Sequence, residues 1–239
     1  MTHKTVIPSA IQSTPSNHPI KKVDGLYAEL TQGPESALRR LGIPEATILL
    51  VTSKDKEEQR KGIDQLADNE KALIAIYEYH TSQYAERYVA EKLTDRIDVL
   101  TCPEALIIVI DISNDERAAI IAVERIQDAG VLKILALGEY DRDGPAVSIA
   151  ATEKIISMFD NVVGRIANHI LGMGQDCSVD GLLNERDELN DIVEDISRNS
   201  VHDNAKMLAE RKIDEIKCVR DTPDDPLFEQ LISKPPSPN

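Results

Sequence analysis

Three carboxylates are the residues of this chain whose types and spacing could best support chemistry. Asp111 ends an unbroken apolar run, and Asp141 and Asp143 closely follow the next apolar run along the chain. Carboxylates brought together at the ends of neighbouring parallel strands can hold Mg²⁺ or accept a phosphoryl group. We therefore treat these three residues as a candidate ligand or magnesium cleft. The structural alternatives are that Asp111 is a strand-end residue hydrogen-bonded to the next turn, and that Asp141 and Asp143 belong to a solvated acidic loop.

The segment after Asp111 is poorly suited to bind a phosphate. Ser113 and Glu116 have the spacing of a capping box, in which a hydroxyl and a carboxylate satisfy backbone N–H groups at a helix start. A phosphate would need those same N–H groups, and the carboxylates repel it. The sequence also contains none of the glycine-rich phosphate-binding motifs. We predict no cofactor, with Mg²⁺ as the ion that the carboxylates could bind.

Evidence for nucleophilic or calcium-dependent chemistry is weak in this sequence. Cys102 precedes a proline and could be exposed, but no histidine is placed by sequence to activate it. The stretch from Glu139 to Gly144 resembles the opening of a calcium loop, but Ala150 stands where a bidentate glutamate is required. The balance of these residues favours a protein that is not an enzyme.

The elements expected to position these residues alternate along the chain. Four short apolar runs are separated by amphipathic stretches that would form helices. This alternation is typical of βαβ crossovers in a parallel sheet with helices on both faces. We predict an α/β fold with about four to five parallel strands. The runs that predict strands are residues 47–52, 72–77, 106–112 and 131–137.

The composition changes along the chain and suggests four parts. They are a flexible N-terminal arm with a short helix (1–45), the α/β domain (46–175), an amphipathic helical extension (180–218) and a disordered tail (219–239). In the extension, apolar residues recur at helical spacing with charges between them. That segment would either dock on its own domain or pair with a second copy.

Charge and cysteine usage restrict the partners and the compartment. The net charge of −15 opposes contact with nucleic acid or an anionic membrane, and the 3% aromatic content argues against base stacking. The three cysteines form no CxxC pair, which is typical of free thiols in a reducing compartment. We find no signal peptide and no run long enough to insert into a membrane. The sequence predicts a cytoplasmic protein.

The order of elements between Ala90 and about Ile170 carries a family resemblance. Its parts are Leu106–Ile112, Ser113–Glu116, Arg117–Ala129, Val131–Leu137 and Asp143-Gly144. In this order the segment resembles the middle of the FtsZ/tubulin nucleotide-binding domain. The glycine-rich loop of that family is replaced here by Ser113–Glu116. The resemblance therefore implies a degenerate member that binds partners and does not hydrolyse GTP.

A competing resemblance is to response-regulator receiver domains. Asp111 would stand at the phosphoacceptor position, with Gly138 near the small residue after the fourth strand. The first expected strand is followed by Thr52-Ser53-Lys54 instead of an acidic pair for Mg²⁺. A pseudo-receiver that takes no phosphate fits this pattern as well as an active one.

These observations lead to one expected function and one alternative. We expect a non-catalytic regulatory or scaffold protein that acts through protein–protein contacts, and that self-associates through residues 180–218. The alternative is a Mg²⁺-dependent nucleotide-binding enzyme or a receiver-type phosphoacceptor that uses Asp111.

Overall fold

The fold is helical throughout the part of the chain that can be described. A computed structural model describes residues 33–79, 81–112, 115–138, 144–171 and 178–220. Those residues form helices and connections and contain no strand. The predicted α/β fold with its parallel sheet is therefore wrong.

Eleven α-helices and one 3₁₀ turn follow one another in the described residues. They are α1 (Gly33–Arg40), α2 (Glu45–Val51), α3 (Lys56–Gln65), α4 (Glu70–Glu78), α5 (Gln83–Asp95), η3 (Ile97–Val99), α6 (Pro103–Ile112), α7 (Glu116–Arg125), α8 (Ala129–Leu137), α9 (Pro145–Ile170), α10 (Val179–Asn199) and α11 (Asp203–Arg220). No described helix combines the length and the apolar character needed to cross a bilayer.

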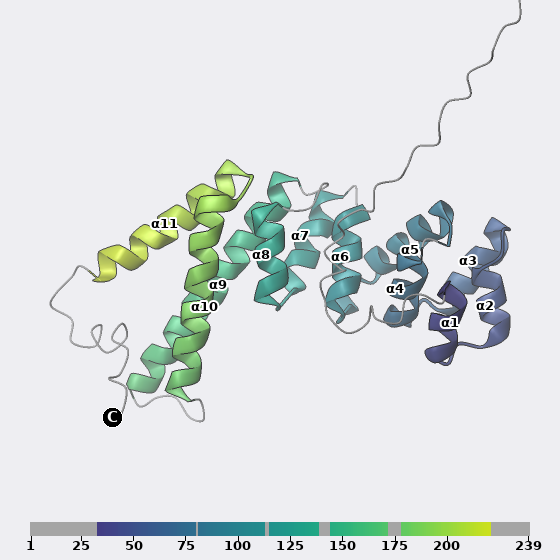
Figure 1. Ribbon diagram of the computed structural model, residues 1–239, viewed down its shortest axis with the longest axis horizontal. Coiled ribbons are helices and arrows are strands. Elements are labelled where there is room, and N and C mark those ends of the chain that lie inside the picture. The colour runs from purple at the N-terminus through teal and green to yellow at the C-terminus, as the bar shows by residue number, and fades with distance from the viewer. Residues whose placement is uncertain (1–32, 80, 113–114, 139–143, 172–177, 221–239) are drawn as a thin grey trace, which may run out of the picture.

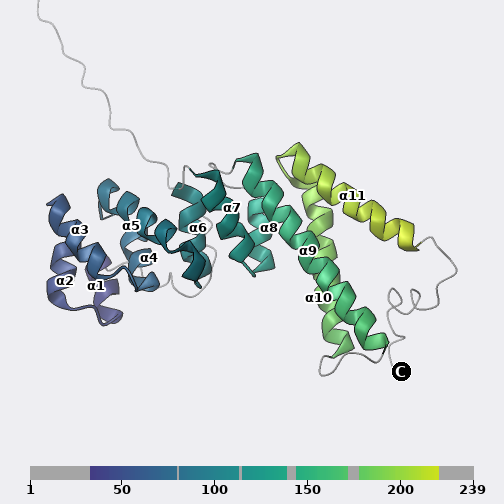
Figure 2. The same ribbon diagram turned by 180° about the vertical axis from the view of Figure 1, so that it is seen from behind.

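The helices pack in consecutive pairs that stack into an elongated array. The pairs are α2 with α3, α4 with α5, α6 with α7, α8 with α9, and α10 with α11. Neighbouring pairs are joined by further packing, such as α3 on α5, α4 on α6 and α7 on α9. Figures 1 and 2 show the chain running from α1–α3 at one end to α10 and α11 at the other.

The apolar run that predicted the central strand is helix α6. Its residues Leu106 to Ile110 are all buried, because α4, α5 and α7 surround the helix. A short apolar run buried on every side has no polar face, so its periodicity does not separate a strand from a helix. The helix-start signal is nevertheless in the sequence, since Pro103 and Glu104 occupy the first turn.

Polar caps explain why two other expected strands are helices. The Asn69 side chain accepts a hydrogen bond from the N–H of Ala72 (3.0 Å), which starts α4. The Asp128 carboxylate likewise accepts from the N–H of Val131 (3.0 Å) and starts α8. Capping side chains of this kind favour a helix start over an extended strand. The remaining expected strand, residues 47–52, lies largely in α2, directly after Pro44.

The C-terminal segment forms two helices that pack on the chain itself. The apolar stripe of α10 is buried, and α10 packs on α9, α11 and α8. Its members are Leu182, Leu189, Val193 and Ile196. The stripe that suggested pairing with a second copy is thus covered within one chain.

A polar junction ties the turn between α10 and α11 to the end of α8. The N–H of Val201 donates to the carbonyl of Leu137 (3.0 Å), and the Ser200 hydroxyl donates to the carbonyl of Ala136 (2.8 Å). The Ser148 hydroxyl, from α9, donates to that same carbonyl (2.6 Å). Gly138 ends α8 in the left-handed conformation, with φ of 72°. Four helices therefore meet at this junction.

Candidate interaction groove

Asp111 lies in the last turn of α6 and forms a hydrogen bond that joins α6 to α4. Its Oδ2 accepts a hydrogen bond from the Tyr77 hydroxyl of α4 (2.8 Å), and Tyr77 is only 6% exposed. Asp141 and Asp143 lie outside the described residues, so the structure does not bring the three carboxylates together. Among the residues it describes, no group of three side chains is arranged to hold a metal ion.

Removing the Tyr77 hydroxyl should weaken the packing of α4 on α6. We expect Tyr77→Phe to lower the free energy of unfolding by about 1–3 kcal/mol, because the hydrogen bond joins a partly buried phenol to a carboxylate. Urea unfolding followed by circular dichroism measures the change. An unaltered midpoint and slope would show that this hydrogen bond does not contribute to stability.

Neighbouring carboxylates accept hydrogen bonds from the start of α7 and from the Cys102 thiol. Asp115 accepts from the N–H of Arg117 (3.0 Å) and caps α7, while Ser113 lies outside the described residues. The Cys102 thiol donates to Glu104 (2.6 Å). Burial, together with this carboxylate, raises the pKa of the thiol to about 11. At neutral pH the thiol is therefore protonated and a poor nucleophile.

A groove opens between α10 and α11 at the C-terminal end of the array. The two helices meet at the turn after Asn199 and then diverge (Figure 1). The space between them has a volume of about 400 Å³. It is lined by Glu194, Ser197, Arg198, Glu210, Ile213, Asp214 and Lys217.

The direction of α11 accounts for the groove. Near the turn, the small buried residues Ala205 and Ala209 allow α11 to approach its neighbours closely. Further along, the Lys212 ammonium lies 2.6 Å from the Asp160 carboxylate of α9 and 5.7 Å from the centre of the Phe159 ring. The second half of α11 is therefore anchored to α9, which leaves its other edge open beside α10.

Lys212 stays charged in this anchor although its side chain is only 13% exposed. Burial lowers the pKa of the ammonium, but hydrogen bonds to Asp160 and Glu215 outweigh this and leave the pKa above its ordinary value. The paired charge is therefore a stable part of the α9–α11 contact at neutral pH.

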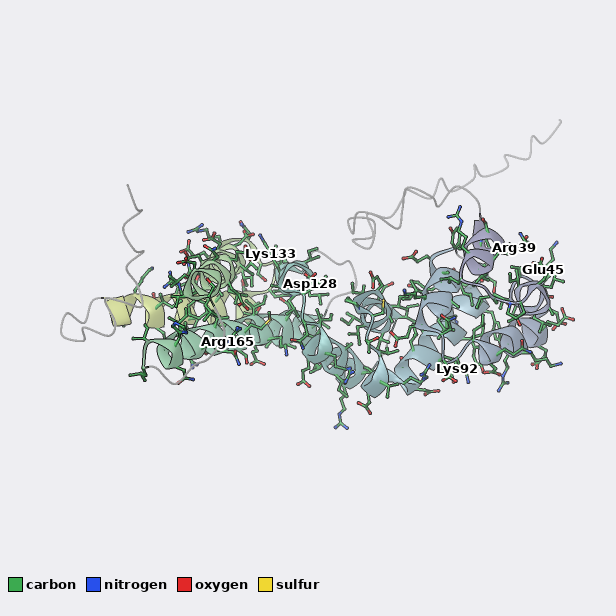
Figure 3. The ribbon with its side chains drawn as sticks, turned by 90° about the horizontal axis from the view of Figure 1, so that it is seen from below. Arg39, Glu45, Lys92, Asp128, Lys133 and Arg165 are labelled. Carbon is green, nitrogen blue, oxygen red and sulfur yellow. The ribbon has the colours of Figure 1, made fainter. Side chains whose placement is uncertain are left out.

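Ion pairs from two neighbouring helices hold α10, the other wall of the groove. Figure 3 labels Lys133 of α8 and Arg165 of α9 at this end of the array. Lys133 pairs with Asp195, and Arg165 lies 3.6 Å from Glu185. The hydrogen bond from Lys133 holds the pKa of Asp195 below its ordinary value. Both walls are thus positioned by contacts outside the groove.

The two walls differ in how their charges are satisfied. On α10, Glu194 pairs with Arg198 (2.7 Å) and accepts from the Asn190 amide (3.3 Å). On α11, Glu210, Asp214 and Lys217 make no ion pair or side-chain hydrogen bond with the described residues. Ile213 also lines the groove; it is partly buried and packs against the hydrophobic core. The α11 wall therefore presents three unpaired charges beside an apolar side chain.

No motif in the sequence marks these groove residues as a site. The one available signal was their spacing, because positions 210, 213, 214 and 217 share one face of a helix. That spacing is common on solvated helix faces. These four residues line a groove here because the contact of Lys212 with Asp160 anchors α11 on α9 and leaves this face of α11 open beside α10.

Comparisons with protein-family models, with curated proteins and with solved structures find no match for the chain. The resemblances to FtsZ/tubulin and to receiver domains depended on strands at residues 106–112 and 131–137. Those segments are helices α6 and α8, so neither resemblance contributes to the function proposed below.

Proposed function

We propose that the chain is a non-catalytic scaffold or regulatory protein that binds a partner protein in the groove between α10 and α11. The observation that carries the proposal is the α11 wall, where unpaired charges and a partly buried isoleucine line the same groove. Stacked helix pairs that contact mainly their neighbours form extended surfaces of the kind that bind other proteins. Grooves between helices accept short segments of other proteins.

The phosphoacceptor alternative loses its support from the position of Asp111. That role needs a carboxylate facing an open cleft at a strand end. Asp111 instead lies on α6, with an oxygen committed to the hydroxyl of the nearly buried Tyr77. We therefore do not propose a reaction at this residue.

Self-association remains a prediction, but the residues expected to form the contact are different. The apolar stripe of α10 is covered within one chain and is not available to a second copy. Exposed apolar side chains near the turn, Val201 and Met207, are the residues through which a second copy could make contact. A homo-oligomer would add copies of the groove without changing its chemistry.

Site-specific photo-crosslinking in the full chain tests the proposed function. A photoreactive residue placed at Ser197 or Lys217 should form covalent adducts with another protein in an extract of the source cells. The same residue at the exposed Glu91 of α5 or Glu124 of α7 serves as the control. Adducts at the groove positions alone support the proposal. No adduct, or equal adducts at all four positions, would contradict it, and an adduct of twice the chain mass identifies self-association.

A further inference from the structure

We infer that the groove binds a basic amphipathic segment, with a Lys or Arg side chain between Glu210 and Asp214 and an aliphatic side chain on Ile213. This inference rests on the proposed function and specifies the chemistry of the partner. It is carried by the geometry and the charge of the two groove walls.

Glu210 and Asp214 form the acidic edge of the groove. They are one helical turn apart on α11, so both carboxylates lie along the same edge. Neither makes an ion pair with a described residue. By contrast, the nearby Glu215 already contacts Arg211 and Lys212. Like charges one turn apart repel each other, and a cation bound between them removes that repulsion.

The facing wall strengthens the preference for a cation. Helix α10 contains seven Asp or Glu residues and two Arg residues. Arg198, the cation of that helix that lines the groove, is neutralised by Glu194. The groove lining contains three carboxylates (Glu194, Glu210 and Asp214) and two cations (Arg198 and Lys217), so its net charge is negative, as is that of the whole chain. A basic segment is attracted there, whereas an acidic segment, a nucleic acid or an anionic membrane is repelled.

Ile213 and Lys217 add specificity to the site. Ile213 offers a partly buried apolar contact beside the two carboxylates, which suits the stem of Lys or Arg or a neighbouring Leu. Lys217 lies one turn after Asp214, toward the end of α11. An acidic residue or a chain-terminal carboxylate of the partner would pair with it.

The size of the groove sets the length of the segment. A volume of about 400 Å³ is at the lower end of the range for small-ligand sites, roughly 300–1,000 Å³. It accommodates a few side chains, not the surface of a folded domain. The partner therefore presents a short segment and not a broad interface.

Fluorescence anisotropy with three labelled twelve-residue peptides tests the inference on the full chain. The first peptide contains Lys, Leu and Ala in a helical pattern, the second has Glu in place of Lys, and the third has Ser in place of Leu. We expect the Lys–Leu peptide to bind, the Glu peptide not to bind, and the Ser peptide to bind at least fivefold more weakly. Equal binding of the first two peptides would overturn the inference.

Matched charge variants locate the binding site. Glu210→Gln combined with Asp214→Asn should weaken binding of the Lys–Leu peptide at least fivefold. Glu91→Gln combined with Glu124→Gln removes the same charge from exposed positions on α5 and α7 and should change the affinity less than twofold. Equal weakening in both double variants would show general attraction to an acidic protein and would refute the site. All four substituted side chains are exposed, so the fold should persist, which circular dichroism verifies.

Failure of this inference is distinguishable from failure of the proposed function. If the groove positions crosslink to another protein but the Lys–Leu peptide does not bind, the groove is an interface for a partner of different chemistry. If neither result is obtained, both proposals are wrong.

Discussion

Replacing Gly138 with alanine should lower the free energy of unfolding by about 3 kcal/mol, which corresponds to a fall of about 6–12 °C in the unfolding temperature of a chain of this size. Two effects add. Gly138 has φ of 72°, a left-handed conformation that an L side chain adopts only at a cost of about 1–2 kcal/mol. A β-carbon there would also lie 3.0 Å from the His202 ring and still closer to the Val201 side chain.

The position of Gly138 explains why such a small change matters. It ends α8 at the place where the turn between α10 and α11 is hydrogen-bonded to the carbonyls of Ala136 and Leu137. A displaced turn would weaken these hydrogen bonds and shift both walls of the groove. We therefore expect Gly138→Ala to reduce binding of the Lys–Leu peptide as well as stability.

Two other glycines separate the causes. Gly42 has φ of 73° but open space around its α-carbon, so Gly42→Ala measures the backbone effect alone. Gly164 lies within α9, also in open space, and Gly164→Ala should stabilise the chain by about 0.5–1 kcal/mol. Thermal unfolding by circular dichroism compares the three variants. If Gly138→Ala is no worse than Gly42→Ala, the close packing of the turn on α8 is refuted.

Replacing Ile196 with alanine should lower the free energy of unfolding by about 2–5 kcal/mol, as expected for a large buried side chain that leaves a cavity. Ile196 is 0% exposed and belongs to the stripe through which α10 packs on its own chain. Urea unfolding measures the loss, and light scattering reports the molecular mass of the same sample.

Met207 provides the control for this experiment, because it is apolar but 64% exposed. Met207→Ala should change stability by less than about 0.5 kcal/mol. The two measurements also test where the α10 stripe is buried. If Ile196→Ala left the unfolding free energy unchanged but halved the mass, the stripe would be buried against a second copy and not against α9.

Part of the fold could be predicted from local sequence. The apolar runs at residues 72–77, 106–112 and 131–137 are largely buried, as apolar runs of that length usually are. The predicted secondary structure of these runs is wrong, because an apolar run that is buried on most sides shows neither the alternation of a strand nor the stripe of an amphipathic helix. The capping residues Asn69 and Asp128 were the local signals that favoured helices.

The candidate site could not be predicted in the same way. The apolar run before Asp111 predicts a strand-end carboxylate, but Asp111 lies on α6 and accepts a hydrogen bond from Tyr77 of α4. Glu210 and Asp214 have no local signal that distinguishes them from other charged residues on a helix surface. Their environment depends on the contact between Lys212 and Asp160, which are far apart in the sequence.

The sequence alone determined the acidic character of the protein, the burial of its apolar runs and the helical spacing of the α10 stripe, because these depend on residue type and local periodicity. Only the tertiary structure decided that the buried runs are helices, that the stripe of α10 is covered within its own chain, and that α10 and α11 diverge to form a groove. The physical reason is that each of these outcomes depends on which distant side chains fill the neighbouring space. Local periodicity does not carry that information.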